Sequence, residues 1–251
     1  MPFRILNTIA ISAFLVLLTL VWLEKADVKL LVLVCVLYLL ILGLGIFFIR
    51  LNFFNQNLNR ASNSTDKIAI TFDDGPTDHT EAILDVLKEK NVKASFFCIG
   101  SRINKNSDLL KRISTEGHDI GNHTFNHYWF FPFLSREKVK KELAETEELI
   151  RNFTGRKTAL FRPPFGVTNP TIVSATNFFG YKIVGWSKRT LDGAFRNKRF
   201  VLKRATENMQ GGDVILLHDN YSECAETLRK ILDIVEKKGL KPVTISELFE
   251  L

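Results

Sequence analysis

Two long apolar runs without a charged residue occupy the N-terminal part of the chain. They cover residues 5–22 and 30–49, and a short polar segment, EKADVK, joins them. Each run is long enough for a helix to cross the hydrocarbon core of a bilayer. The first run exceeds the apolar core of a signal peptide, and no small-x-small cleavage site is evident in it. We therefore predict a two-helix transmembrane hairpin over residues 1–50.

The basic residues around the hairpin bear on its orientation. Two spans place both chain ends on the same side of a membrane. The loop between the spans contains Lys25 and Lys29, whereas Arg4 and Arg50 flank the spans at the opposite side. Basic residues in short loops favour the cytoplasm, so the loop charges weakly favour an extracytoplasmic position for the rest of the chain.

After the hairpin the pattern changes twice. Residues 51–65 start amphipathic and end in a polar Asn/Ser/Thr cluster, which predicts a juxtamembrane linker. Over residues 66–251, strand-like and helix-like segments alternate and predict a separate domain. The strand-like runs cover residues 67–72, 93–99, 118–121, 158–161, 181–186, 213–218 and 241–245. The helical patterns cover residues 79–90, 105–116, 136–152, 170–179, 197–210 and 222–238.

This alternation predicts the α/β class with a mainly parallel sheet. Runs that are apolar on both faces fit a sheet that is covered by helices. The pattern alone leaves open a doubly wound open sheet and a closed barrel. The first strand leads into FDDGPTD, which holds a single glycine, so dinucleotide-binding and P-loop functions are excluded.

Charge and cysteine content exclude two further classes. The net charge is +7, and residues 1–60 hold five Lys/Arg and two Asp/Glu, so that +4 remains for residues 61–251. This excess is too modest to indicate a nucleic-acid partner. Cys35, Cys98 and Cys224 lie far apart, which supports neither a disulfide framework nor a thiolate metal site.

Polar residues cluster at the carboxyl ends of the strand-like runs, where α/β barrels keep their chemistry. The first run ends in Asp73 and Asp74, and the third ends in GNHTFNH. The fourth ends in FRPPFG, the fifth leads into GWSKRTLDG, and the sixth ends in ILLHDN. Two adjacent acids at the tip of a buried strand repel each other, so they require a cation, a shared proton or a special task.

His123 and His127 are four residues apart, so on one helical turn both can reach a single ion. Position 124 is Thr, so the H-E-x-x-H motif of zinc proteases is absent. With one carboxylate, the pair forms a two-His-one-acid shell that suits catalytic zinc or iron. The second acid can then act as general base, and His218 can act as general acid. The alternatives are an accidental His pair and an inert core histidine at position 218.

Five stretches in order, TFDDGP, HTFNH, RPPFG, LDG and LLHD, resemble the five motifs of the polysaccharide deacetylases. These proteins form carbohydrate esterase family four and share the NodB homology domain. The resemblance covers about residues 66–251 and implies a distorted (β/α) barrel. It also implies a deacetylase that depends on a divalent metal.

The resemblance implies a role for each matching position. Asp74, His123 and His127 would hold the metal, most often Zn²⁺, with Co²⁺, Ni²⁺ and Mn²⁺ as other candidates. Asp73 would be the general base. Arg162 would pair with Asp73 and keep it ionised and oriented.

Further matches concern the substrate and the leaving group. His218 would protonate the departing amine, and Asp192 would tune His218. A backbone N–H near Phe165 would stabilise the oxyanion, and Leu216 would line a pocket for the acetyl methyl group. Pro163 would belong to the substrate-binding set.

The chain departs from the family pattern at three places. Arg189 stands where the fourth motif often has Asp, and Gly193 stands where it has Trp, which bears on substrate preference. The third motif ends in Phe165 instead of Tyr. After His127 comes YWFFPFL, whose aromatic residues could stack on sugars, touch the membrane or form a satellite core. Of these three, the satellite core is favoured.

Taken with the resemblance, the residues predict a membrane-anchored hydrolase that removes N-acetyl groups from an amino-sugar glycan, peptidoglycan-like or chitin-like. Its catalytic domain would face the cell envelope. Three alternatives stay open: O-deacetylation, a glycan-binding relative without activity, and a Mg²⁺-dependent phosphatase-type site. The phosphatase alternative explains Asp73 and Asp74 but leaves His123, His127 and His218 without a task.

Overall fold

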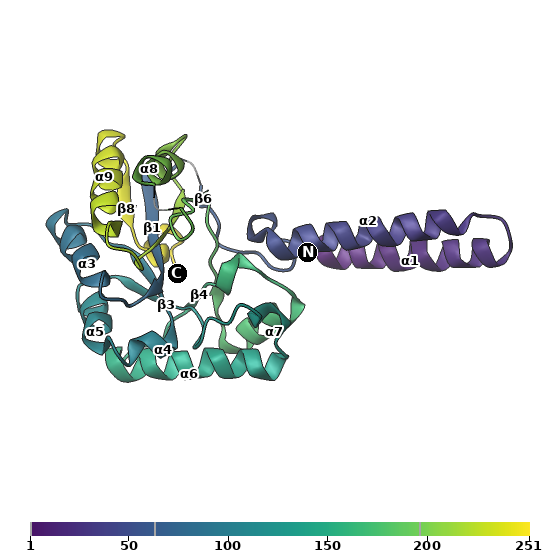
Figure 1. The fold of residues 1–251 in the computed structure, drawn as a ribbon, viewed down its shortest axis with the longest axis horizontal. Coiled ribbons are helices and arrows are strands. Elements are labelled where there is room, and N and C mark those ends of the chain that lie inside the picture. The colour runs from purple at the N-terminus through teal and green to yellow at the C-terminus, as the bar shows by residue number, and fades with distance from the viewer. Residues whose placement is uncertain (1, 63, 196) are drawn as a thin grey trace.

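The protein, seen in a computed structural model, is a helix-covered sheet from which a long helical hairpin projects (Figure 1). The structure describes residues 2–62, 64–195 and 197–251. The hairpin consists of α1 (Pro2–Trp22) and α2 (Val28–Phe47). Both helices are long and apolar enough to cross a membrane, by length and composition.

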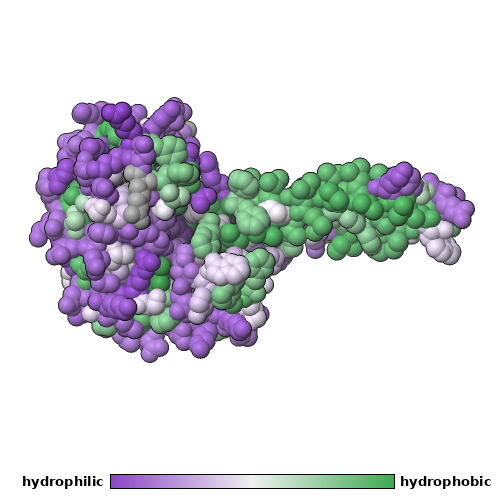
Figure 2. Space-filling view, viewed as in Figure 1, coloured by the Kyte–Doolittle hydropathy of each residue, from purple (hydrophilic) through white to green (hydrophobic). Residues whose placement is uncertain are grey.

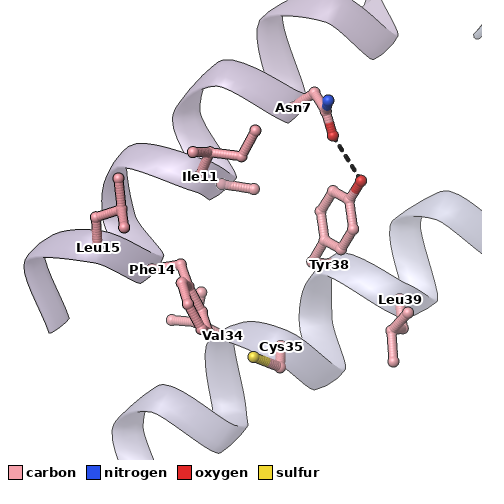
Figure 3. Close-up of a pocket in the computed structure, with 9 residues that line it drawn as sticks. Asn7, Ile11, Phe14, Leu15, Val34, Cys35, Tyr38 and Leu39 are labelled. Atoms are coloured by element: carbon pink, nitrogen blue, oxygen red, sulfur yellow. Dashed lines mark hydrogen bonds between the residues drawn. The ribbon is translucent and has the colours of Figure 1, made fainter. Parts of the chain in front are cut away.

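The side chains of the hairpin are almost entirely uncovered. No residue of α1 is buried, and in α2 only Gly45 is. The core helix of a soluble protein would be mostly buried, so α1 and α2 do not resemble such helices. The two helices share a polar contact, in which the Tyr38 hydroxyl donates to Oδ1 of Asn7 at 2.6 Å (Figure 3). This bond beside an apolar hollow holds the two helices in register.

Among the described residues the sheet has eight strands, and all their pairings are parallel, which confirms the predicted mainly parallel sheet. The order is β5-β4-β3-β2-β1-β7-β6, and β8 pairs with the start of β1. The strands are β1 (Lys67–Gly75), β2 (Ser95–Cys98), β3 (Asp119–Asn122), β4 (Leu160–Phe161), β5 (Lys182–Ile183), β6 (Lys188–Arg189), β7 (Val214–His218) and β8 (Lys241–Val243).

Helices cover the outer face of the curled sheet. They are α3 (Thr80–Glu89), α4 (Gly100–Ile103), α5 (Ser107–Thr115), α6 (Arg136–Thr154), α7 (Pro170–Phe179), α8 (Lys198–Thr206), α9 (Cys224–Lys237) and α10 (Ile245–Leu248). Three short 3-10 turns complete the described chain: η1 (Ile49–Leu51), η2 (Phe131–Phe133) and η3 (Pro164–Gly166). All predicted helices are present, and the short elements β6, α4 and α10 were not predicted.

Alternation along β1 sorts its side chains between two cores. Ile68, Ile70 and Phe72 belong to the cluster under helices such as α3 and α9. Ala69 belongs to the inner cluster, and Thr71 and Asp73 share its face of the strand. The interior of the curl therefore receives the polar residues that end β1.

The sheet is a half-barrel, because β5 and β6 do not pair with each other in the described sheet. Residues 52–61, which we call the strap, lie in this gap. Leu58 bridges in parallel to Val184, and Arg60 bridges in antiparallel fashion to Asp213. The distorted barrel implied by the resemblance is confirmed, with the strap between its two open edges.

The strap packs against both the hairpin and the barrel. Phe53 and Phe54 are buried, and the Phe53 ring fills the space beside Gly45. The Asn57 amide donates to the Ile49 carbonyl at 3.0 Å. The side-chain amides of Asn57 and Asn59 both donate to this carbonyl and so satisfy a backbone group between the hairpin and the barrel. The division into a hairpin and a catalytic domain stays a prediction.

Candidate active site

One cavity lies at the carboxyl ends of the strands. β1 and β7 are neighbours in parallel register, with Asp73 opposite His218. The cavity has a volume of about 320 Å³. Most of the predicted site residues line it: Asp73, Asp74, His123, His127, Phe165, Leu216 and His218.

The two acids share this cavity because β1 is irregular at its end. In a regular strand, Asp73 and Asp74 would point to opposite faces. The register shifts between Asp73 and Gly75, and Asp74 has a φ of 74°. This bulge allows neighbouring carboxylates to line the same cavity.

Asp74, His123 and His127 form a group that could hold a metal ion. Their ligand atoms lie within 4.8 Å of one another. Nε2 of each histidine lies 3.6 Å from Oδ1 of Asp74. Such spacings suit ligands that each stand about 2 Å from one zinc ion.

The electrostatics of the group also suit a cation. Burial lowers the pKa of His127 to about 4, so its ring is neutral and keeps a lone pair. Burial raises the pKa of Asp74, but His123, His218 and His127 outweigh this effect and leave the pKa lowered. Asp74 is therefore an anion beside the imidazoles of His123 and His127, and a carboxylate with two imidazoles is a typical shell for a catalytic divalent metal.

A second contact orients His123. Its Nδ1 lies 2.7 Å from the backbone carbonyl of Arg162. Since a carbonyl only accepts, Nδ1 carries the proton, and Nε2 is left free to face Asp74.

The prediction that His123 and His127 share a helical turn is wrong. Residues 123–127 form a loop, in which Thr124 has a φ of 67° and His127 a φ of 52°. The Thr124 hydroxyl accepts from the amide of His127 at 3.1 Å. Glu142 of α6 holds the same loop, since it accepts from the amides of Phe125 and Asn126 at 3.0 and 2.8 Å. The side chains meet because of this loop and not because of helical periodicity.

Asp73 is paired with a fully buried Arg162. Nη1 of Arg162 donates to Oδ1 of Asp73 at 2.6 Å and to the Thr71 hydroxyl at 2.8 Å. Its remaining nitrogens donate to the carbonyls of Val184 and Gly185. Burial lowers the pKa of Arg162, although the guanidinium stays charged beside the Asp73 carboxylate.

His218 is paired with a fully buried Asp192. Its Nδ1 lies 2.7 Å from Oδ1 of Asp192, and its backbone amide donates to Oδ2 at 2.8 Å. Burial lowers the pKa of His218, but Asp192, with Asp73 and Asp74, raises it to about 9. Position 193 must be small here, because a Cβ on Gly193 would lie 3.2 Å from the His218 ring.

Two of the three predicted substrate-binding residues line the cavity, and the third does not. Phe165 is half-exposed at a φ of 60°, and Leu216 is buried in the floor of the cavity. Pro163 is buried and does not line the cavity. Trp186 forms part of the wall and packs on Gly166, whose φ of 70° and missing Cβ admit the indole.

Sequence reasoning missed three residues that support the site. Trp186 ends the strand-like run 181–186, at the edge where the other candidate residues stand, so its position was a usable signal. Asn220 donates to Oδ2 of Asp74 at 3.1 Å and directly follows LLHD. Glu142 gave no signal, because it stands among many acids of one amphipathic helix.

The expected satellite core around YWFFPFL is wrong for three of its five aromatic residues, since Tyr128, Trp129 and Phe133 are exposed. Phe131 is fully buried. Trp129 is 76% exposed and Phe133 is 82% exposed. The 3-10 turn η2 directs its residues to opposite sides, so that one ring enters the core while its neighbours face outward.

The fold and site together define a hydrolase-like centre, with a metal-ligand group, a carboxylate and a histidine in one cavity of a curled (β/α) barrel. Comparison with known proteins agrees with this class. The family model for polysaccharide deacetylase matches residues 60–184. The chain is 36% identical over 192 residues to a peptidoglycan-N-acetylglucosamine deacetylase of Bacillus cereus, covering 74% of this chain and 89% of that protein. The chain therefore belongs to the polysaccharide deacetylase family.

Solved structures show the same fold. Peptidoglycan deacetylase PdaC from Bacillus subtilis is similar with a TM-score of 0.69 and 32% identity, over 78% of this chain and 93% of that chain. A family pseudoenzyme from Bacillus anthracis, BA3943, is similar with a TM-score of 0.70 and 25% identity, over 76% and 67% of the two chains. Because a deacetylase and a pseudoenzyme share this fold, the fold alone does not indicate activity. The argument for activity therefore rests on the site residues.

Proposed function

We propose that the chain is a metal-dependent N-deacetylase that acts on an acetylated amino-sugar glycan of the cell envelope. The observation that carries this proposal is the cavity in which Asp73 and His218 face each other beside Asp74, His123 and His127. The printed activity of the Bacillus cereus relative supports a peptidoglycan-like substrate.

The residues fit a divalent metal, and zinc best. Two neutral imidazoles and one carboxylate are a common catalytic zinc set that leaves a position open. When bound, the metal would polarise the acetyl carbonyl and make water a stronger nucleophile. Co²⁺, Ni²⁺ and Mn²⁺ stay candidates, because the donor set also suits them.

Asp73 acts as the general base in this proposal. The Arg162 guanidinium donates to one oxygen of the Asp73 carboxylate, which leaves the other to accept a proton from the attacking water. The water oxygen adds to the acetyl carbon, and the proton remains on Asp73.

His218 acts as the general acid. Asp192 keeps its imidazolium protonated near neutral pH, since the pKa of His218 is about 9. Nε2 donates its proton to the amide nitrogen as the C–N bond breaks. Acetate and a free amino sugar are the products. The N–H of Phe165 as an oxyanion donor and Leu216 as a methyl contact belong to the same proposal.

The hairpin would anchor the enzyme in a membrane. The near absence of burial in α1 and α2 supports this, because water would otherwise surround both apolar helices. The loop lysines and the envelope substrates of the relatives support an extracytoplasmic barrel.

Acetate release from a panel of acetylated envelope glycans tests the function. We expect wild type to release acetate, Asp73→Asn to lose this activity, and Asp78→Asn, an exposed acid in the following turn, to keep it. A protein that binds the glycans but releases no acetate when loaded with zinc would be a binding relative. Phosphate release with Mg²⁺ would support the phosphatase alternative.

A further inference from the structure

Four exposed aromatic residues form a patch where the hairpin meets the barrel. We call Phe47, Phe48, Trp129 and Phe133 the aromatic patch. Their exposed fractions are 65%, 56%, 76% and 82%. All four line one groove with a volume of about 970 Å³. Contiguous apolar surface of this kind marks a site for another apolar body.

The groove continues into the catalytic cavity. Phe165, Trp186 and Arg189 line both. Phe165 also stacks edge-on against the His127 ring, with centroids 5.0 Å apart. A molecule in the groove can therefore reach the candidate metal ligands past two aromatic walls.

The other end of the groove lies at the level where α2 would leave a membrane. α2 ends at Phe47, and Arg50 is the first charged residue after it. Aromatic and basic residues gather at the interface between lipid and water. In Figure 2 the hydrophobic surface of the hairpin extends onto the adjoining part of the domain.

Direct contacts hold the hairpin and the barrel, which form the two sides of the groove, in a fixed relative position. The amide of Thr168, just after η3, donates to the Ile46 carbonyl at 3.1 Å. Ile49 is buried between the hairpin and the barrel. These contacts therefore fix the distance between the end of α2 and the catalytic cavity.

Three arginines add positive charge to the groove. Arg50, Arg189 and Arg204 line it and are exposed, and no acidic residue is among its lining residues in the described chain. Nε of Arg204 donates to the Arg189 carbonyl at 2.8 Å, and the Arg189 guanidinium lies 5.5 Å from the Trp186 ring. Apolar walls with uncompensated guanidinium groups fit a lipid that carries phosphate.

We propose that the groove binds a lipid phosphate or diphosphate to which the acetylated amino sugar is attached. This inference rests on the proposed deacetylase function and narrows its substrate class to a lipid-linked glycan at the membrane surface. The lipid lies against the aromatic patch, its phosphate meets Arg204 and Arg189, and the sugar passes Trp186 into the cavity. A free glycan chain would need neither the patch nor the arginines.

The test uses the full-length, zinc-loaded protein in phosphatidylcholine vesicles with three matched substrates. One N-acetylglucosamine oligomer is joined to a polyprenyl chain through a diphosphate, one through a neutral ether, and one is free in solution. We expect kcat/KM for acetate release to be highest for the diphosphate substrate. It should exceed the value for the ether substrate by about tenfold, because one charge-assisted hydrogen bond contributes about that factor.

Two variants test the groove, each with a matched control. Arg204→Gln should abolish the preference for diphosphate over ether, whereas Arg199→Gln on the same helix should keep it. We also expect kcat/KM to be higher for the ether-linked lipid than for the free oligomer. Phe133→Ser should abolish this second preference, whereas Phe178→Ser, which changes an exposed ring outside the groove, should keep it.

Several results would overturn the inference. Equal kcat/KM values for the diphosphate and ether substrates would do so, as would a preference that survives in Arg204→Gln. A Phe133→Ser protein that binds vesicles more weakly but retains its preference would show a membrane contact only. In these cases acetate release still supports the proposed function, whereas no release from any substrate would refute both.

Discussion

His218 is bound twice by one buried carboxylate, through Nδ1 to Oδ1 of Asp192 at 2.7 Å and through its backbone amide to Oδ2 at 2.8 Å. The carboxylate therefore fixes both the place and the charge of the ring. Because the pKa of His218 is raised to about 9, the acid form is present below that pH and is lost as pH rises through it.

Asp192→Asn should move the alkaline limb of the activity profile from about 9 toward the ordinary histidine value of 6.5. The pH dependence of kcat/KM for acetate release measures this shift. Asp108→Asn, an exposed acid on α5, is the control and should keep the wild-type profile. If the alkaline limb does not move in Asp192→Asn, then Asp192 does not control the pKa of His218.

His123→Ala should lose the bound metal and, with it, acetate release by about 100-fold or more, since even loss of a ligand's supporting partner costs 10–100-fold. Metal content per chain, measured by atomic emission, checks the first effect independently of activity. His79→Ala, outside the site, should retain both. Full metal content in His123→Ala would contradict the assigned ligand set.

Arg162→Met should destabilise the barrel by about 3–5 kcal/mol, because it leaves the buried Asp73 carboxylate without its partner. For a domain of this size, that corresponds to a melting temperature lower by about 10 °C. Thermal unfolding in detergent checks it, against Arg151→Met on the exposed face of α6. Equal melting temperatures for the two variants would show that the pair with Arg162 does not stabilise the barrel.

Glu142→Ala should weaken metal binding by about 10–100-fold without removing a ligand, because it frees the loop that carries His123 and His127. Metal titration gives the dissociation constant. Glu148→Ala, exposed on the same helix, should bind as wild type does. Unchanged affinity in Glu142→Ala would mean that the loop keeps its shape by itself.

Gly185→Ala should destabilise the barrel, because its new Cβ would lie 1.9 Å from Oδ1 of Asn59 in the strap. Asn59→Ala removes that oxygen, so the double variant should be more stable than the sum of the two single effects predicts. Melting temperatures of the four proteins form the cycle. Additive effects would show that the strap moves aside freely.

The sequence predicted best what depends on local periodicity. Apolar runs with alternating helical patterns indicated the parallel sheet, and polar residues after each run indicated one reactive edge. Asp73 and His218 lie opposite each other because parallel strands end at the same edge. The resemblance then assigned roles that the spacing alone left open.

The features that depend on long-range pairing were not predictable in this way. Nothing in a polar Asn/Ser/Thr cluster shows that Leu58 will pair with Val184. The spacing of His123 and His127 suggested a helical turn, although positive φ values at Thr124 and His127 produce the loop. The aromatic stretch suggested a core, but its composition does not show which rings face outward, and Trp129 and Phe133 are exposed.

The strap also bears on the order in which the molecule is built. It joins a segment made early to Val184 and Asp213, which are made much later. The strap therefore cannot complete its pairing until both residues have been made, long after the hairpin. Contacts this distant in sequence form slowly. In the proposed membrane-anchored form, both helices of the hairpin would already be in place when Val184 and Asp213 are made.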